Sequence, residues 1–275
     1  MEKEKVPANI RRGSTLLLLF LLLFLMPAKA EEAPEAAELP QIIIGSDEYQ
    51  PYCYYNVDGS PQGVDVELAR EAFRRMGYEP IFRQLVWEDK DEALSSSEVD
   101  CLWSGFAMND REDEYTWASM GLSSRVVAVV RADSDIADLP ELAGRRTAMQ
   151  ATGWGEYLLT RQNQPNLPQV GAVYSFSTME EVFAVMRKGY ADAIVGHECV
   201  LDVFLTENEG RFRKLETPLG TAKLGVAFAR GTHELFAQAL TQTLLDMAAD
   251  GTTQAILDEY GLADVVRVEE GQESK

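Results

Sequence analysis

Arg111 is the side chain of this sequence best suited to hold a small anion. It ends a turn that follows an apolar stretch at residues 100–104 and Gly105. A guanidinium group is planar and can donate to both oxygens of a carboxylate at once. Open α/β sheets bind their ligands beyond the carboxyl ends of the strands. The position therefore predicts a carboxylate clamp; the alternative is a surface arginine that pairs with an acidic neighbour in the sequence.

The elements around this turn alternate between strands and helices, which predicts an α/β fold with mostly parallel pairing. The clearest helix covers residues 65–76, where apolar side chains recur at steps of three and four and Gly77 follows. The pattern starts afresh after a long apolar strand at 125–131, which suggests a second lobe. Strands are predicted at 41–46, 80–86, 100–104, 125–131, 146–150, 170–174, 191–195 and 223–229, and helices at 91–97, 155–160, 179–187, 232–250 and 253–260.

A second motif, Gly-Val-Asp-Val-Glu-Leu at residues 63–68, opens the helix that precedes the arginine turn. In this order and at this spacing, the two segments resemble the type II extracellular solute-binding proteins, specifically the amino-acid-binding family 3. The resemblance covers residues 41–262. It implies a periplasmic-binding-protein fold of two hinged lobes, each a mostly parallel sheet flanked by helices, with two crossover strands between them.

The same resemblance divides the chain. Lobe 1 is expected at residues 41–125 together with 225–262, and lobe 2 at 126–224. The periodicity of the sequence alone does not predict that lobe 1 is discontinuous. Two crossover strands make a hinge, and proteins of this kind work by closing around their ligand.

In similar proteins the arginine of this turn binds the α-carboxylate of the ligand. Aromatic side chains near the first two strands would cover its carbon skeleton and attract an ammonium group; Tyr52 is expected to pack inward instead. Free N–H groups at the helix start near residue 152 would bind carboxylate oxygens. The expected ligand site consists of Arg111, Tyr49, Trp87, Gly105, Ala107, Thr152, Trp154, His197 and Glu198.

Three of these positions depart from the family pattern. Ala107 stands where a serine or threonine usually donates a hydroxyl group. Trp154 replaces a small hydroxyl residue and would narrow the pocket or stack on the ligand. His197 stands where an aspartate usually holds the α-amino group, and a histidine near pH 7 is a poorer partner for an ammonium group. Either Glu198 replaces that aspartate or the ligand lacks a free α-amine.

Residues 1–30 are typical of a secretory signal peptide. Arg11 and Arg12 precede an unbroken apolar run at residues 16–26, and Ala28-Lys29-Ala30 is a small-x-small cleavage site. As a helix this run rises only about 17 Å, short of the roughly 30 Å hydrocarbon layer. No cysteine follows the site directly, so a soluble periplasmic or secreted product is expected. Residues 31–40 read as a disordered spacer and residues 263–275 as an acidic tail.

The chain is acidic, with a formal net charge of −20. This charge argues against a nucleic-acid partner, because such binding depends on neutralising phosphates. The sequence has three cysteines, Cys53, Cys101 and Cys199, and an odd number leaves at least one without an intramolecular partner. Their spacing matches no zinc pattern, and we expect neither a metal nor a cofactor.

Three functions remain open at this point. The first is a monomeric transport receptor that binds a small carboxylate-bearing solute and delivers it to the permease of an ABC importer. The second is an enzyme on the same fold, like the cyclohexadienyl dehydratases, with His197 and Glu198 as proton-transfer groups. No G-x-S-x-G or H-E-x-x-H motif supports catalysis. The third is a sensor read by a separate membrane partner.

Overall fold

The strands of the computed structural model form one mixed sheet and a small hairpin. The structure describes residues 38–161, 166–264 and 266–268. The predicted signal peptide, most of the spacer and the end of the acidic tail lie outside the described residues. The sheet contains β1 (Gln41–Ser46), β4 (Glu79–Gln84), β5 (Cys101–Leu102), β6 (Tyr115–Arg131), β7 (Arg146–Gln150), β8 (Ala172–Phe176), β9 (Ala193–His197), β10 (Phe212–Lys214), β11 (Gly220–Ala229) and β12 (Val266–Val268), and the hairpin contains β2 (Tyr54–Tyr55) and β3 (Pro61–Gln62).

Two groups of parallel strands lie at the ends of this sheet. The strand order is β4-β1-β5-β11-β6-β9-β7-β8, with β10 and β12 also paired to β6. We call β4, β1 and β5 the first strand group and β9, β7 and β8 the second strand group; pairing within each group is parallel. Parallel strands place their carboxyl ends at one edge, so each group offers one edge at which loops can gather.

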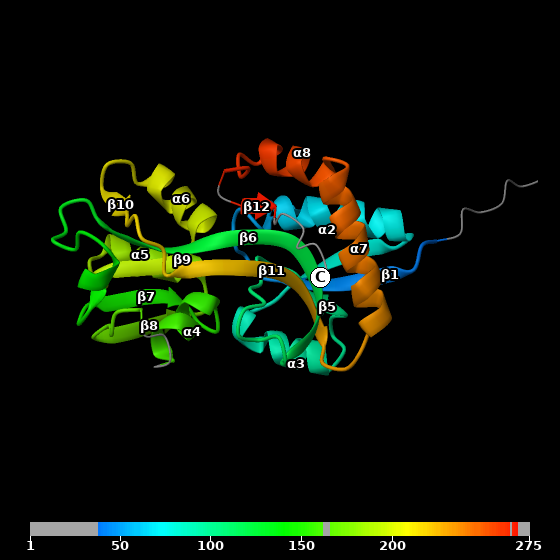
Figure 1. The fold of residues 1–275 in the computed structure, drawn as a ribbon, viewed down its shortest axis with the longest axis horizontal. Helices are drawn as coiled ribbons and strands as arrows, with labels where there is room; N and C mark the ends of the chain where they lie inside the picture. The colour runs from blue at the N-terminus through cyan, green and yellow to red at the C-terminus, as the bar shows by residue number, and fades with distance from the viewer. Residues whose placement is uncertain (1–37, 162–165, 265, 269–275) are drawn as a thin grey trace, which may run out of the picture. The chain divides into compact units, whose positions relative to one another are not determined.

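The two groups are joined by β6 and β11, which pair antiparallel along most of their length. Figure 1 shows these two strands side by side, running from one group to the other. The register of the pair shifts between Leu224 and Gly225. A Cβ atom at Gly225 would lie 2.6 Å from the side chain of Met108, so a glycine is required where the loop before Arg111 crosses this strand. The described residues from Leu39 onward form a single compact unit, and the lobe boundaries stay a prediction.

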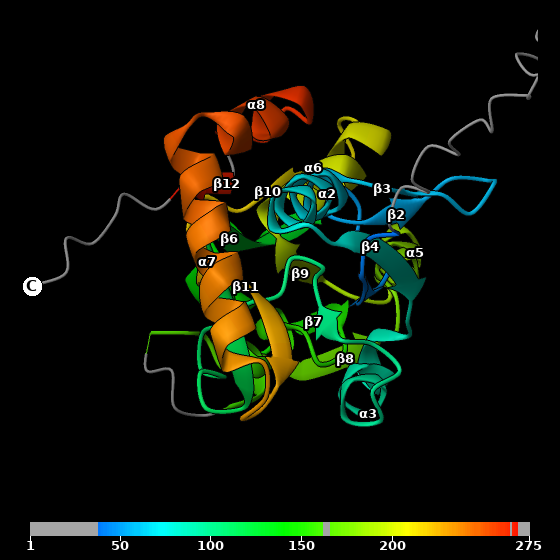
Figure 2. The same ribbon diagram turned by 90° about the vertical axis from the view of Figure 1, so that its right-hand side faces the viewer.

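Helices cover the sheet, and α2 lies where the sequence signals predict it, whereas α6 was not predicted. The amphipathic α2 buries one face, including Leu68 and Phe73, and Gly77 ends it in a left-handed conformation with φ 79°. Figure 2 shows α7 lying along β6, on which it packs. The helices are α2 (Val64–Met76), α3 (Lys90–Ser95), α4 (Trp154–Thr160), α5 (Met179–Arg187), α6 (Glu198–Glu207), α7 (Glu234–Ala249) and α8 (Thr252–Glu259), with 3-10 turns η2 (Trp87–Asp89) and η3 (Leu139–Leu142).

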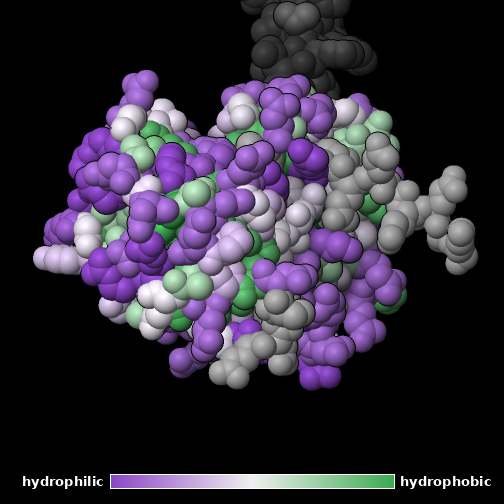
Figure 3. Space-filling model, turned by 60° about the vertical axis from the view of Figure 1, so that its left-hand side comes forward, coloured by the Kyte–Doolittle hydropathy of each residue, from purple (hydrophilic) through white to green (hydrophobic). Residues whose placement is uncertain are grey.

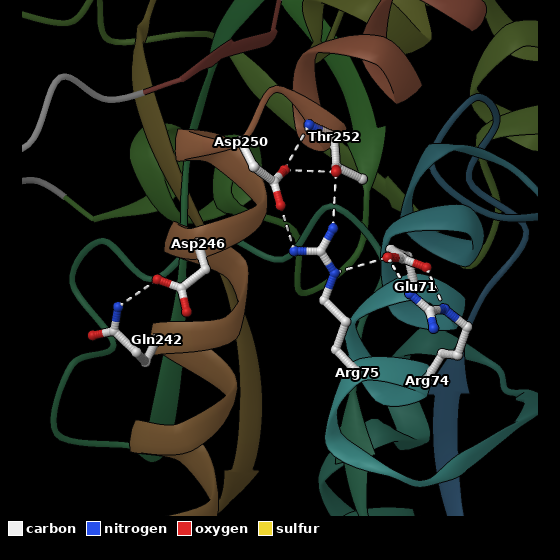
Figure 4. Close-up of polar contacts among 7 residues, drawn as sticks. All are labelled: Glu71, Arg74, Arg75, Gln242, Asp246, Asp250 and Thr252. Carbon is white, nitrogen blue, oxygen red and sulfur yellow. Dashed lines mark hydrogen bonds and ion pairs between the residues drawn. The ribbon is translucent and has the colours of Figure 1, made fainter.

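A charged network on the surface fastens α2 to the turn between α7 and α8. Arg75 donates to the Asp250 carboxylate at 2.7 Å and to the Thr252 hydroxyl at 2.9 Å (Figure 4). Its Nε donates to Glu71, which also accepts both bonds from Arg74. These side chains are partly exposed, so the network orients the helices more than it stabilises them.

The core is apolar and the surface is polar. Trp103, Phe73 and Tyr52 are among the largest fully buried side chains, and the inward packing expected of Tyr52 is confirmed at 1% exposure. On the face of the molecule drawn in Figure 3, hydrophilic residues predominate and hydrophobic ones form smaller patches. Among the described residues, no helix has the length and apolar character needed to cross a bilayer.

Candidate functional site

A small cavity lies where loops from both strand groups meet. It measures about 30 Å³, which is room for one or two water molecules, so a larger ligand requires the two strand groups to move apart. Seven of the nine predicted site residues line it, and Thr152 and Glu198 do not. The predicted residues at the cavity are Tyr49, Trp87, Gly105, Ala107, Arg111, Trp154 and His197; it is also lined by Asp47, Ser104, Phe106, Val126, Met149, Gln150, Gly153, Gly155, Val195 and Gly196.

Arg111 is buried beside this cavity, with 7% of its surface exposed. The turn that carries it places Asp110 in a left-handed conformation and closes with a bond from the Arg111 N–H to the Met108 carbonyl. Its Nη2 donates to the carbonyl oxygen of Thr152 at 2.8 Å. Its Nη1 is buried and finds no partner among the described residues. Burial lowers the pKa of the guanidinium, but an arginine stays charged, so an unsatisfied cationic donor lies next to the cavity.

At the helix start near Thr152, one of the N–H groups that the sequence suggested as free is already bonded. The Thr152 N–H donates to the Glu156 carboxylate at 2.6 Å, within the first turn of α4. The Thr152 hydroxyl is buried without a partner among the described residues and does not line the cavity. Because Glu156 holds the Thr152 N–H, Thr152 contributes its carbonyl to Arg111 and offers no backbone donor to a ligand. Because Thr152 does not line the cavity, its predicted contact with the ligand has no geometric support.

Trp154 is the first residue of α4 and closes one side of the cavity. Its indole N–H donates to the Asp110 carboxylate at 3.3 Å, across the gap between the second and the first strand group. The side chain is buried. Of the two roles predicted for it, narrowing the pocket agrees with this position.

His197, at the end of β9, has its ring against two tyrosines. Its ring centroid lies 5.9 Å from that of Tyr49 and 5.6 Å from that of Tyr52, both nearly edge-on. Burial, and secondly the charge of Arg111, lower its pKa to about 4. The imidazole is therefore neutral at pH 7, and its Nδ1 finds no partner among the described residues. A neutral ring can exchange a hydrogen bond with a ligand but supplies no counter-charge.

Glu198 points away from the cavity into an ion-pair network. Both of its oxygens accept from Arg125 on β6, and the ammonium group of Lys214 lies 2.7 Å from one of them. Burial alone would raise its pKa, but the bonds from Arg125 and Lys214 outweigh that effect and lower it. Glu198 thus holds the start of α6 against β6 and β10, and its predicted role as a ligand partner has no geometric support.

Asp47 is a cavity residue that the sequence reading missed. It follows β1 directly and is buried. One carboxylate oxygen accepts from the Ser104 hydroxyl at 2.6 Å and the other from the Gln150 amide at 2.5 Å. Burial raises the pKa of this carboxyl group, while the two bonds lower it in part. The signal that would have found Asp47 is the one used for Arg111, a charged residue just beyond a buried strand.

The part of the chain that the structure describes contains neither a metal-binding cluster nor a reactive thiol. It contains no group of three histidine, cysteine, aspartate or glutamate side chains that could hold a metal ion. The three thiols, Cys53, Cys101 and Cys199, are free and buried. Burial raises the pKa of each thiol, which keeps it protonated and unreactive near neutral pH.

Comparison with known proteins gives the family. Residues 42–263 match the model of the bacterial extracellular solute-binding proteins, family 3. The chain belongs to this family. It is 24% identical to the L-cystine-binding protein TcyA of Bacillus subtilis over 79% of each chain. It is 25% identical to the histidine-binding periplasmic protein of Escherichia coli, over 88% of this chain and 96% of that protein.

Solved structures confirm the fold expected from the sequence, that of the type II periplasmic amino-acid-binding proteins. An ABC uptake transporter substrate-binding protein from Streptococcus pneumoniae with bound histidine superposes with a TM-score of 0.72. That match is 19% identical and covers 82% of this chain and 94% of the other. At this identity the likeness concerns the fold, and the ligand must be inferred from the cavity itself.

Proposed function

We propose that this protein is an extracytoplasmic receptor for a small amino acid or a similar carboxylate, which it delivers to an ABC importer. The observation that carries the proposal is Arg111, whose buried Nη1 has no partner among the described residues and lies beside the cavity. A buried cationic donor without a partner is costly, and a ligand carboxylate would satisfy it with charge-assisted hydrogen bonds.

The charges around the cavity favour a ligand with both signs. Arg111 supplies one positive charge and Asp47 one carboxylate, while His197 is neutral. A zwitterion would match this arrangement with no net charge left buried. We therefore assign the carboxylate of the ligand to Arg111 and its ammonium group to Asp47, with Tyr49 and Trp87 covering the carbon skeleton.

Closure would bring the two predicted lobes together over the ligand. Four polar contacts already cross between residues of the two strand groups: Arg111 to the Thr152 carbonyl, Gln150 to Asp47, Trp154 to Asp110, and Ser177 to Glu88. A ligand that adds contacts to both sides prefers the closed state and shifts the equilibrium towards it.

The names of the relatives support the cellular role. They describe a cystine-binding protein, a periplasmic histidine-binding protein and an ABC transporter substrate-binding protein. We accordingly propose a monomer that is exported with cleavage of residues 1–30 and that docks on an importer permease. A receptor is favoured over an enzyme because only His197 of the predicted proton-transfer pair lines the cavity.

The test is a thermal-shift screen of the purified mature protein. The compounds are amino acids, their deaminated analogues, and prephenate and arogenate. A ligand that binds only the native state raises the melting temperature by mass action. A shift with amino acids and none with the amine-free acids is the expected result. A shift with prephenate or arogenate, followed by their conversion, would replace the receptor proposal with a dehydratase.

A further inference from the structure

Trp154 is fixed in the cavity by contacts that do not involve a ligand. One edge of its indole ring donates to Asp110, next to Arg111. The opposite end of the ring packs over Gly220 on β11, where an added Cβ atom would lie only 2.8 Å from Cη2. The hydrogen bond to Asp110 on one side and the backbone of Gly220 on the other therefore leave the indole little freedom to move out of the cavity.

The backbone that carries Trp154 is equally restricted. Gly155, the next residue, approaches β9 so closely that a Cβ atom would lie 2.9 Å from the Val195 side chain. Because α4 cannot retreat past β9, the first residue of the helix has to project over the cavity. The 30 Å³ cavity is the space that remains beneath it.

We infer that Trp154 sets the upper limit on ligand size, so that this site accepts a short amino acid and excludes long side chains. The inference rests on the proposed function. The carboxylate end is anchored at Arg111, directly beside the Asp110–Trp154 contact, so a longer ligand would have to displace the indole. Displacement breaks its hydrogen bond to Asp110 and its packing on Gly220. Only long ligands would cause this displacement, so only their affinity is lowered by it.

The experiment is calorimetric titration of the wild-type protein and of Trp154→Ala with glycine, alanine and serine, and with arginine, histidine and cystine. The wild type is expected to bind at least one short ligand about tenfold or more tightly than any long one, a size discrimination within the range of hydrophobic pockets. Trp154→Ala is expected to gain about tenfold or more for long ligands and thus to lose or reverse this preference.

Three further variants keep the result interpretable. Trp154→Phe retains a ring and tests the same step if the alanine variant does not fold; an intermediate preference is expected. Gly220→Ala adds a methyl group under the indole without changing a cavity residue, and it should alter the ratio of short to long affinities. Thr160→Ala removes an exposed side chain from the end of the same helix, outside the cavity, and should leave that ratio unchanged.

The outcomes separate this inference from the proposed function. If the wild type binds arginine, histidine or cystine as tightly as short ligands, the size limit is refuted and the receptor stands. The same holds if the Trp154 variants keep the wild-type preference. If neither the wild type nor a folded Trp154 variant binds any amino acid, the receptor itself is refuted.

Discussion

Single residues at the cavity differ in whether the surrounding protein satisfies them. Asp47 receives two hydrogen bonds, whereas Arg111 and His197 each keep a buried nitrogen without a partner among the described residues. Unsatisfied buried groups are expensive, and they mark the atoms that a ligand would reach. Beside the ammonium contact assigned to Asp47, the ligand contacts should therefore include Arg111 and His197.

Replacing Arg111 tests the carboxylate clamp. Arg111→Ala should weaken binding of the ligand found in the screen by about 2–5 kcal/mol, because it leaves the carboxylate buried without a partner. Arg111→Lys keeps the charge but not the planar fork, so an intermediate loss is expected. Calorimetry gives the affinities and circular dichroism confirms folding. Binding that survives Arg111→Ala would show that the carboxylate lies elsewhere.

His197 should make stability depend on pH in a defined direction. Its pKa is lowered to about 4 in the folded state, against about 6.5 when unfolded, so the unfolded state binds the proton first as the pH falls. The stabilising contribution is complete above pH 6.5 and is lost progressively towards pH 4. The loss is on the order of 3 kcal/mol.

The measurement is the difference in unfolding free energy between wild type and His197→Gln from pH 4 to 8. A difference is needed because Asp65, whose burial raises its pKa to about 7, acts in the opposite direction. The wild type should lose stability relative to the variant as the pH falls from 6.5 to 4. A difference that is constant across this range would mean that the imidazole is not held neutral.

At the scale of elements, the regular helices and strands were predictable and the long or interrupted ones were not. The predicted strand at 41–46 and helix at 179–187 match β1 and α5 exactly as bounded, because periodicity, capping and turn residues agree there. The predicted strand at 125–131 is only the last part of β6, which begins at Tyr115. Gly121 and several polar residues interrupt the apolar pattern of the first part, so that part was not predicted. The helix α6 was missed since its apolar run follows β9 without a break.

The same reasoning explains the errors at the site. Residues in the loops that follow strands, such as Arg111 and Trp87, were predictable because such loops gather at the carboxyl edge of parallel strands. The pairing of Glu198 with Arg125 and Lys214 was not predictable. These two residues lie on β6 and β10, and the sequence does not show that these strands are neighbours. The bond from the Thr152 N–H to Glu156 likewise depends on a side-chain orientation that spacing alone leaves open.

The ion pair at the start of α6 gives a prediction for that element. Glu198→Gln keeps the size of the side chain but removes its charge from Arg125 and Lys214. Both partners are partly exposed and can return to water, so the expected loss of unfolding free energy is about 1–2 kcal/mol. Ligand affinity should stay within about twofold of wild type, since Glu198 does not line the cavity. An affinity loss with unchanged stability would restore Glu198 to the site.

At the scale of the molecule, the proposed function depends on how β6 and β11 let the two strand groups approach. These strands connect the groups, and four polar contacts cross between the groups. Three of these contacts involve cavity residues. The fourth, between the Ser177 hydroxyl and the Glu88 carboxylate, involves neither a cavity residue nor a ligand contact, so it isolates the effect of closure from that of binding.

Ser177→Ala should therefore act on ligand release. Losing one partly exposed hydrogen bond to a carboxylate destabilises the closed state by about 0.5–1.5 kcal/mol, which corresponds to a roughly two- to tenfold faster dissociation. The association rate should change little, because the open state lacks this contact. Stopped-flow fluorescence of Trp87 and Trp154, which line the cavity, can follow both rates.

Ser60→Ala is the matched control, since Ser60 also donates to a carboxylate but within one hairpin. Equal dissociation rates in wild type and Ser177→Ala would show that this contact does not hold the closed state, whereas an equal acceleration in the control would point to a general loss of stability.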